Sequence, residues 1–355
     1  MGWGRSIEDL DDALMAQPLR ATESVSAEIS RNLALELVRV TEAGALASAR
    51  WMGRGDKNTA DGAAVDAMRR ALGMIPMDGV IVIGEGEKDE APMLYIGEQI
   101  GTGEPPQVDV AVDPIDGTTL LSKGLPNAIS VVAMAAGRGS LYDAKHVHYM
   151  HKIATGADAA GSLNIDDPVA VNLQRVARAK RMRVSNLTVV ILDRPRHEAL
   201  IKEVRDTGAR IKLISDGDVA GAVMTAIDGT GLDLLMGIGG SPEAVLAAAA
   251  LKCLGGEIQC KLYARNPEEK EKAEAAGATF DRVLGIDDLV RSDDVFFAAT
   301  GVTDGEVLQG VKYHTNWAET ESLVTRSRSG TLRRIYARHH WGYKQREWLG
   351  QPEEG

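Results

Sequence analysis

The chain has 355 residues, a formal net charge of −11 and 26% charged residues. This length predicts two domains, and the acidic balance argues against nucleic acid or an anionic membrane as the main partner. We expect no membrane-spanning segment and no secretory signal. Cys253 and Cys260 lie in or near an apolar segment and are interpreted as reduced core thiols, which favours a cytoplasmic location.

The N-terminal part predicts a flexible extension followed by two helices. Residues 1–25 are acidic and weakly periodic. Apolar residues recur near a helical period over 26–51, and Thr59 is expected to cap a second helix that ends at Gly73. Asp61 lies in the first turn of that helix, where a purely structural role through the helix dipole is a real alternative to a functional one.

Two apolar runs predict buried strands that end in acidic loops. The run 79–83 leads into Glu85 and three further carboxylates up to residue 90, and the run 108–112 leads into Asp113. We expect Asp113 at the end of its strand and Asp116 where the next helix begins. Such a junction places hard oxygen ligands beside a helix N-terminus, an arrangement that suits Mg²⁺ or Mn²⁺ and a phosphate.

The middle of the chain predicts a domain boundary. An apolar strand is expected at 127–135. His146, His148 and His151 lack a local partner for a zinc site, so we interpret them as strand-surface and cleft residues. A polar and then basic segment follows, and we place the boundary there, so that 26–183 and 184–355 form separate domains.

Beyond the boundary, apolar runs and amphipathic segments alternate as in α/β domains. Strands are expected at 188–192, 211–214, 232–236, 258–263, 294–300 and 331–337, and helices at 195–206, 218–227 and 268–275. An alanine-rich helix is expected to have Ser241 as its cap, Pro242 at its first position and Gly255 after its end.

Several common catalytic motifs are absent from the sequence. There is no nucleotide phosphate-binding loop, no dinucleotide fingerprint and no esterase nucleophile elbow. What remains is a set of carboxylates expected at strand ends and helix starts, namely Asp61, Glu85, Asp89, Asp113, Asp116 and Glu243. If they converge, their repulsion makes bound metal the simplest explanation. Spacing alone does not show convergence, because most acidic residues are exposed.

Two further loops suit a phosphorylated polyol. Arg194 and Arg196 flank a strand-to-helix turn, where paired arginines oppose the helix dipole, so a bound anion explains them better than a plain surface role. Asp216 and Asp218 surround a glycine at another strand end. Their carboxylates could accept bonds from sugar hydroxyls, and an Asp cap for the next helix is an equally good interpretation.

The stretch Asp113-Pro114-Ile115-Asp116-Gly117-Thr118 resembles the signature of the lithium-sensitive, metal-dependent phosphatase superfamily. The chain is most similar to class II fructose-1,6-bisphosphatases. The motifs that carry this resemblance occur in the family's order at 51–62, 84–87, 90–95, 194–197, 216–218 and 237–243. Many members carry Glu where this chain has Asp116.

The resemblance implies a layered α/β/α/β/α sandwich of the sugar phosphatase type, with the site between a metal-binding α+β domain, 26–183, and an α/β sugar-phosphate-binding domain, 184–355. It implies hydrolysis of the 1-phosphate of fructose 1,6-bisphosphate in gluconeogenesis by metal-activated water, with two or more Mn²⁺ or Mg²⁺ ions. The expected partner is a small sugar bisphosphate, and we expect a homo-oligomer, either a dimer or a tetramer.

The resemblance also implies residue roles. Asp61 and Glu85 would hold one metal ion, and Asp113, Asp116 and Glu243 a second. Thr118, assisted by Asp89, would orient and deprotonate the attacking water, and Lys57 would lie near the reacting phosphate. The residues expected to bind substrate are Asp116, Gly117, Thr118, Tyr149, Arg194, Pro195, Arg196, Asp216, Gly217, Asp218 and Gly240.

Three alternatives stay open at this point. A dual enzyme would also act on sedoheptulose 1,7-bisphosphate, and an inositol-monophosphatase-type enzyme would share the chemistry with a different substrate. A sugar-phosphate sensor would bind without turnover. The set Asp89, Thr118 and Glu243 argues against the sensor, which has no need of a water-activating pair.

Overall fold

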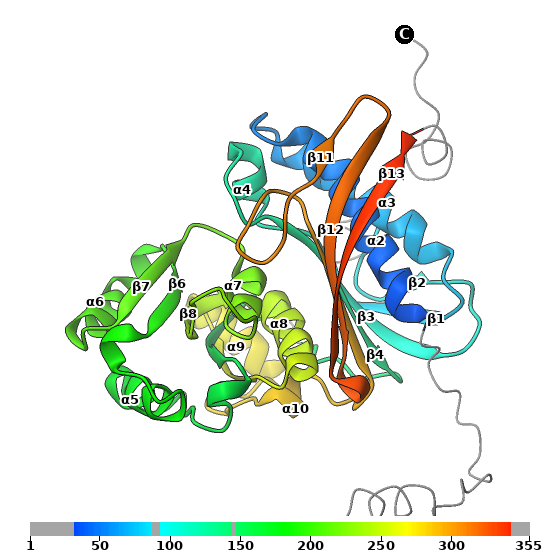
Figure 1. Ribbon diagram of the computed structural model, residues 1–355. Helices are drawn as coiled ribbons and strands as arrows, with labels where there is room; N and C mark the ends of the chain where they lie inside the picture. The colour runs from blue at the N-terminus through cyan, green and yellow to red at the C-terminus, as the bar shows by residue number, and fades with distance from the viewer. Residues whose placement is uncertain (1–31, 87–92, 144–146, 342–355) are drawn as a thin grey trace, which may run out of the picture.

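The computed structural model describes residues 32–86, 93–143 and 147–341. The expected extension 1–25 lies outside the described residues, as does the start of the first predicted helix. Within the described part, two β-sheets and the helices around them form five alternating layers (Figure 1). This arrangement confirms the predicted layered α/β/α/β/α fold.

The first sheet has eight strands in the order β11-β12-β10-β4-β3-β1-β2, with β13 paired to β12. Its strands are β1 (Asp78–Ile83), β2 (Gln99–Ile100), β3 (Gln107–Asp116), β4 (Ile129–Ala136), β10 (Val295–Gly301), β11 (Lys312–Tyr313), β12 (Trp317–Arg326) and β13 (Thr331–His340). The second sheet has five strands in the order β7-β6-β8-β5-β9. These are β5 (Tyr149–Thr155), β6 (Thr188–Leu192), β7 (Arg210–Ile214), β8 (Leu234–Gly240) and β9 (Glu257–Tyr263).

Helices cover both outer faces and fill the space between the sheets (Figure 1). On the outer face of the first sheet lie α2 (Leu33–Ser48) and α3 (Lys57–Gly73), and between the sheets lie α7 (Asp218–Met224) and α8 (Ser241–Leu254). The outer face of the second sheet carries α5 (Val169–Ala179) and α6 (Glu198–Asp206). The remaining helices are α4 (Thr118–Lys123), α9 (Pro267–Ala275) and α10 (Ile286–Leu289).

The first sheet separates two apolar cores. Successive side chains of a strand point to opposite faces, and β10 shows the result clearly. Phe296 packs into the core shared with α2 and α3, whereas Phe297 packs into the core shared with α8 and the second sheet. Both rings are fully buried. Each phenylalanine therefore holds a different helical layer on the same sheet.

The chain passes between the sheets more than once. β5 precedes residue 184 and pairs with β8 and β9 in the second sheet. β10 follows residue 184 and pairs antiparallel with β4 in the first sheet. The boundary expected after residue 183 therefore does not coincide with the division between the sheets. The reason is that long-range strand pairing, which is invisible to local pattern, assigns these strands.

Two predicted helix starts are wrong by one or more residues. α3 begins at Lys57, and its cap is Asp56, whose carboxylate accepts the N–H of Thr59 at 3.0 Å. Thr59 therefore donates to the cap instead of being it. Gly240 is the cap of α8, and Ser241 is the first residue of the helix. The prediction that α8 ends before Gly255 is confirmed, and this glycine adopts the left-handed conformation with a φ of 74°.

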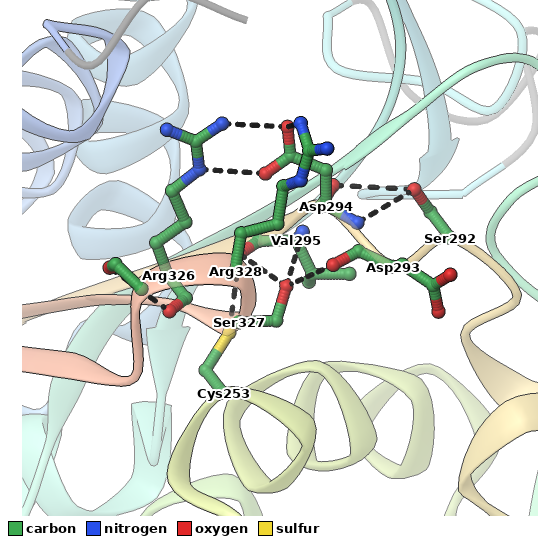
Figure 2. A network of polar contacts seen from close by, with 9 residues as sticks. Cys253, Ser292, Asp293, Asp294, Val295, Arg326, Ser327 and Arg328 are labelled. Carbon is green, nitrogen blue, oxygen red and sulfur yellow. Dashed lines mark hydrogen bonds and ion pairs between the residues drawn. The ribbon is translucent and has the colours of Figure 1, made fainter. Parts of the chain in front are cut away.

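A polar network fixes the turn that joins β12 to β13 (Figure 2). The guanidinium of Arg326 donates two hydrogen bonds of 2.7 Å to Asp294, and the same group lies over the Phe296 ring. Nearby, the thiol of Cys253 donates to the carbonyl of Val295 at 3.3 Å. Both cysteines are free and buried, and burial raises the pKa of each to about 12. The interpretation as reduced core thiols is confirmed.

No helix in the described ranges combines the length and the apolar character needed to cross a membrane.

Candidate active site

One cavity of about 750 Å³ gathers the predicted site residues. It lies where the ends of β1, β3, β6, β7 and β8 meet the N-termini of α3, α4, α7 and α8. The predicted residues that line it are Lys57, Asp61, Glu85, Asp113, Asp116, Gly117, Thr118, Tyr149, Arg194, Arg196, Asp216, Gly217, Asp218, Gly240 and Glu243. Pro195 begins the short helix η4 (Pro195–His197) and is not among the lining residues. Asp89 lies outside the described residues.

β3 delivers the central carboxylates, and it does so differently from the expectation. The strand continues through Pro114 to Asp116 instead of ending at Asp113. Its register with β4 shifts between Asp113 and Asp116, so the proline occupies an irregular position that needs no ladder hydrogen bond. Asp113 also accepts the N–H of Ile115 at 3.0 Å. The irregularity places both aspartates at the cavity.

The acidic side chains lie close enough to perturb one another. Burial raises the pKa of Asp113 well above its ordinary value, and the charges of Asp116, Glu243, Glu85 and Asp61 raise it further, in that order. Burial also raises the pKa of Glu85, to about 8, with Asp61 as the second cause. The five carboxylates expected to bind metal therefore form one electrostatic cluster.

The chemistry of this cluster fits a divalent cation. Among the described residues, no three carboxylate, histidine or cysteine side chains form a ready-made metal-binding group. One oxygen of Glu243 is nevertheless buried without a hydrogen-bond partner, which is unfavourable for a polar atom unless a ligand satisfies it. Mg²⁺ and Mn²⁺ prefer hard oxygen ligands, and a bound divalent ion would offset the repulsion among these carboxylates. The residues therefore fit such an ion in donor type and charge.

Two short helices at the cavity are capped reciprocally across the two sheets. The carboxylate of Asp116, at the end of β3, accepts the N–H of Ala220 in α7 at 2.8 Å. The carboxylate of Asp216, which follows β7, accepts the N–H of Thr119 in α4 at 3.0 Å. Each helix follows a glycine in the left-handed conformation, Gly117 or Gly217, which has no side chain that could cap the helix. The expectation that this loop caps the next helix, α7, is therefore wrong, because Asp216 caps α4 and Asp116 accepts the α7 amide.

The lining of the cavity also carries positive charge. The guanidinium of Arg196 donates to the carbonyl of Ile238 at 2.8 Å and lies over the ring of Tyr149, 5.3 Å from its centroid. Arg194 also lines the cavity and is partly exposed. His148 lines it too, which agrees with its interpretation as a cleft residue. The cavity therefore combines guanidinium groups with the carboxylate cluster.

Sequence reasoning missed a buried lysine behind the site. Lys152 on β5 is 2% exposed, and its ammonium lies 2.5 Å from the carboxylate of Asp218. Burial lowers the pKa of Lys152, but Asp218 and Glu243 raise it, with a net increase. The ammonium therefore offsets part of the negative charge. A signal existed, because Lys152 occupies the apolar face of β5 between Met150 and Ala154.

His197 belongs to the motif 194–197, but the sequence analysis assigned it no role. Its ring is 1% exposed. Nδ1 lies 2.7 Å from the carbonyl of Leu192, and Nε2 lies 2.7 Å from the N–H of Ile238. Because the main-chain N–H can only donate, Nε2 accepts and Nδ1 carries the proton. The neutral ring thus fixes the loop that carries both arginines against β8.

The chain is similar to known proteins along most of its length. A family model described as bacterial fructose-1,6-bisphosphatase, glpX-encoded, matches residues 31–339. The fructose-1,6-bisphosphatase class 2 of Haemophilus influenzae is 46% identical over 325 residues, which cover 88% of this chain and 97% of that protein. The fructose-1,6-bisphosphatase 1 class 2 of Escherichia coli is 45% identical over 330 residues, which cover 89% of this chain and 98% of that protein.

Proposed function

Because the chain belongs to the class 2 fructose-1,6-bisphosphatase family, we propose that it hydrolyses the 1-phosphate of fructose 1,6-bisphosphate. The products are fructose 6-phosphate and phosphate, and the reaction belongs to gluconeogenesis. The observation that carries this proposal is one cavity whose lining includes both the carboxylate cluster and the guanidinium groups of Arg194 and Arg196. A bisphosphate substrate suits such a lining, because the arginines can bind one phosphate while metal held by the carboxylates binds the other.

Divalent metal, Mn²⁺ or Mg²⁺, belongs to this proposal. Asp61 and Glu85 would hold one ion, and Asp113, Asp116 and Glu243 a second. Support comes from the mutual repulsion of these groups and from the unpartnered oxygen of Glu243. Bound divalent ions would lower the pKa of water and offset charge on the phosphate.

The chain's own residues position the reactants. Thr118, at the start of α4, donates its hydroxyl to the carbonyl of Ile115 at 3.3 Å and lines the cavity. In our proposal Thr118 orients the attacking water and Asp89 accepts its proton, a role that rests on the family resemblance alone. Lys57 lines the same cavity and would neutralise charge on the reacting phosphate.

The sugar and its distal phosphate would bind on the second sheet's side. Arg194 and Arg196 suit the phosphate, since guanidinium groups bind such oxygens in bidentate fashion. Asp218, whose carboxylate is paired with Lys152, is fixed at the cavity wall. The absence of a side chain at Gly240 leaves room for the Glu243 carboxylate, because an added Cβ at this position would collide with it. Tyr149, Pro195, Asp216 and Gly217 complete the proposed subsite.

The decisive experiment is phosphate release by protein stripped of metal and then supplied with Mg²⁺ or Mn²⁺. Fructose 1,6-bisphosphate, sedoheptulose 1,7-bisphosphate and inositol 1-phosphate are offered in parallel. We expect metal-dependent turnover of fructose 1,6-bisphosphate, and a Glu85→Gln variant should lose at least about a hundredfold in kcat because it removes a charged metal ligand. Glu268→Gln, a change on the exposed part of α9, is the matched control.

The other substrates decide between the remaining alternatives. Turnover of both bisphosphates would make the enzyme dual, and preference for inositol 1-phosphate would replace the proposed substrate. Binding without turnover would indicate a sensor. The proposal also includes a cytoplasmic location and a homo-oligomeric state, either dimer or tetramer, which light scattering of the purified protein can measure.

A further inference from the structure

We propose that Thr119 is a positioning residue that holds the ammonium of Lys57 at the wall of the active-site cavity. This inference rests on the proposed function, because it concerns the delivery of Lys57 to the reacting phosphate. No role is assigned to Thr119 by the sequence motifs, which end their functional part at Thr118. The contacts of Thr119 connect three elements, α3, α4 and the loop after β7.

The first contact is made by the threonine hydroxyl. Lys57 is the first residue of α3 and its side chain is exposed. The ammonium donates to Oγ1 of Thr119 at 2.8 Å, and this is the hydrogen bond that the described part of the chain shows for it. An exposed lysine otherwise has many rotamers available. The hydroxyl therefore selects the rotamer that keeps the charge at the cavity.

The second contact fixes the threonine itself. Its main-chain N–H donates to the carboxylate of Asp216 at 3.0 Å. Thr119 is half-buried, and its branched Cβ leaves few χ1 rotamers available within a helix. Asp216 belongs to the second sheet's side of the cavity, whereas Lys57 and Thr119 belong to the first. Lys57 is thereby held in register with the residues proposed to bind the sugar.

The hydrogen bond from Lys57 to Thr119 matters for catalysis because it places the ammonium at the cavity before the reaction begins. A cation that is already in place when charge develops on a phosphate needs no reorganisation during the reaction, whereas a mobile one must first be ordered. Removing the hydroxyl while keeping the volume of the side chain should therefore lower kcat more than it raises KM. A general loss of structure would instead lower stability and affect both constants.

The test uses Thr119→Val, which removes the hydroxyl, and Thr119→Ser, which keeps it. We expect Thr119→Val to lower kcat by about tenfold with KM changed by less than about threefold, while Thr119→Ser stays within about twofold of the parent. In a Lys57→Met background, Thr119→Val should have no further effect, because the two changes remove one interaction. Equal losses in both backgrounds, or no rescue by serine, would overturn the proposal.

A second readout does not depend on turnover. Acylation of lysines, followed by peptide mass mapping, should label Lys57 faster relative to exposed Lys123 in Thr119→Val than in the parent. Ser122→Ala is the matched control, since the Ser122 hydroxyl donates to the main-chain carbonyl of Thr119 at 3.1 Å and its removal leaves the Thr119 hydroxyl in place. If Thr119→Val leaves the labelling of Lys57 unchanged, the proposed positioning of Lys57 by Thr119 is refuted. An inactive parent that still shows the labelling difference would refute the proposed function and leave the Lys57–Thr119 contact standing.

Discussion

His197 is a buried side chain at the edge of the site, and its two hydrogen bonds to the main chain set its protonation state. Its two ring nitrogens lie against a main-chain carbonyl and a main-chain N–H, so only the neutral ring satisfies both. Burial, the largest cause, lowers the pKa of His197, and the nearby Arg196 and Arg194 lower it further. In the unfolded chain the ring binds a proton more readily. Acidification through the ordinary histidine range therefore favours the unfolded state.

This leads to a prediction for His197→Asn. At pH 7.5 we expect a loss of about 1–3 kcal/mol in the free energy of unfolding, because the partly buried N–H of Ile238 loses its acceptor. Between pH 7.5 and 5.5 the parent should lose stability through His197 and the variant should not, so the difference narrows by about 1 kcal/mol. Urea unfolding at both pH values measures this. His340→Asn, at an exposed position, is the control, and a difference independent of pH would contradict the assignment.

At the scale of elements, the reciprocal caps explain why two Asp-Gly pairs occur at the cavity. Gly117 and Gly217 have φ values of 98° and 81°, a region that favours glycine. This backbone conformation turns α4 and α7 so that each N-terminus meets a carboxylate from the other side. Asp116 is thus held by an α7 amide through one oxygen, which leaves its other oxygen for the proposed metal.

Gly217→Ala and Gly208→Ala form a matched pair that tests this coupling. Both positions have nearly the same φ, 81° and 83°, so both alanines should cost about 1–2 kcal/mol in stability through backbone strain. Only Gly217 adjoins the caps, and we expect only its variant to lose activity, by about tenfold or more. Thermal unfolding and steady-state kinetics of the two variants provide the comparison. Equal activities would show that the caps do not support the site.

At the scale of the whole molecule, the chain order and the sheet order do not coincide. Among the described strands, β9 pairs with β5 alone, and β10 pairs with β4. The apolar core between the sheets includes residues from both, such as Val131, Phe297, Met150 and Val190. Cutting the chain at the expected boundary would therefore break both sheets and expose the core that they share.

A fragment of residues 184–355 is accordingly expected not to fold. It lacks β5, so β9 loses its partner, and its β10–β13 strands lack β4. A fragment of residues 147–291 keeps every strand of the second sheet and should retain more secondary structure. Circular dichroism and urea unfolding of the two fragments measure this. A cooperative unfolding transition in the fragment 184–355 would show that the boundary at residue 183 is a true domain boundary.

Local pattern was sufficient for much of this protein. The apolar runs predicted β1, β4, β6 and β7 closely, and turn chemistry predicted the end of α8. The charged motifs predicted the lining of the cavity, because residues at strand ends and helix starts occupy one edge of an α/β sheet. The family motifs carried the functional assignment, which the comparisons confirm at the level of the family.

Only the tertiary structure decided the features that depend on distant partners. Strand pairing placed β5 in the second sheet and β10–β13 in the first, and no strand was predicted at β12, whose inward-facing Glu321 is paired with Arg334. The carboxylate that caps α4 comes from Asp216, nearly a hundred positions further along the chain. Partners that are distant in the sequence also determine the roles of Lys152, His197 and Thr119. Periodicity and spacing describe a residue's own element, whereas these contacts arise between elements that only folding brings together.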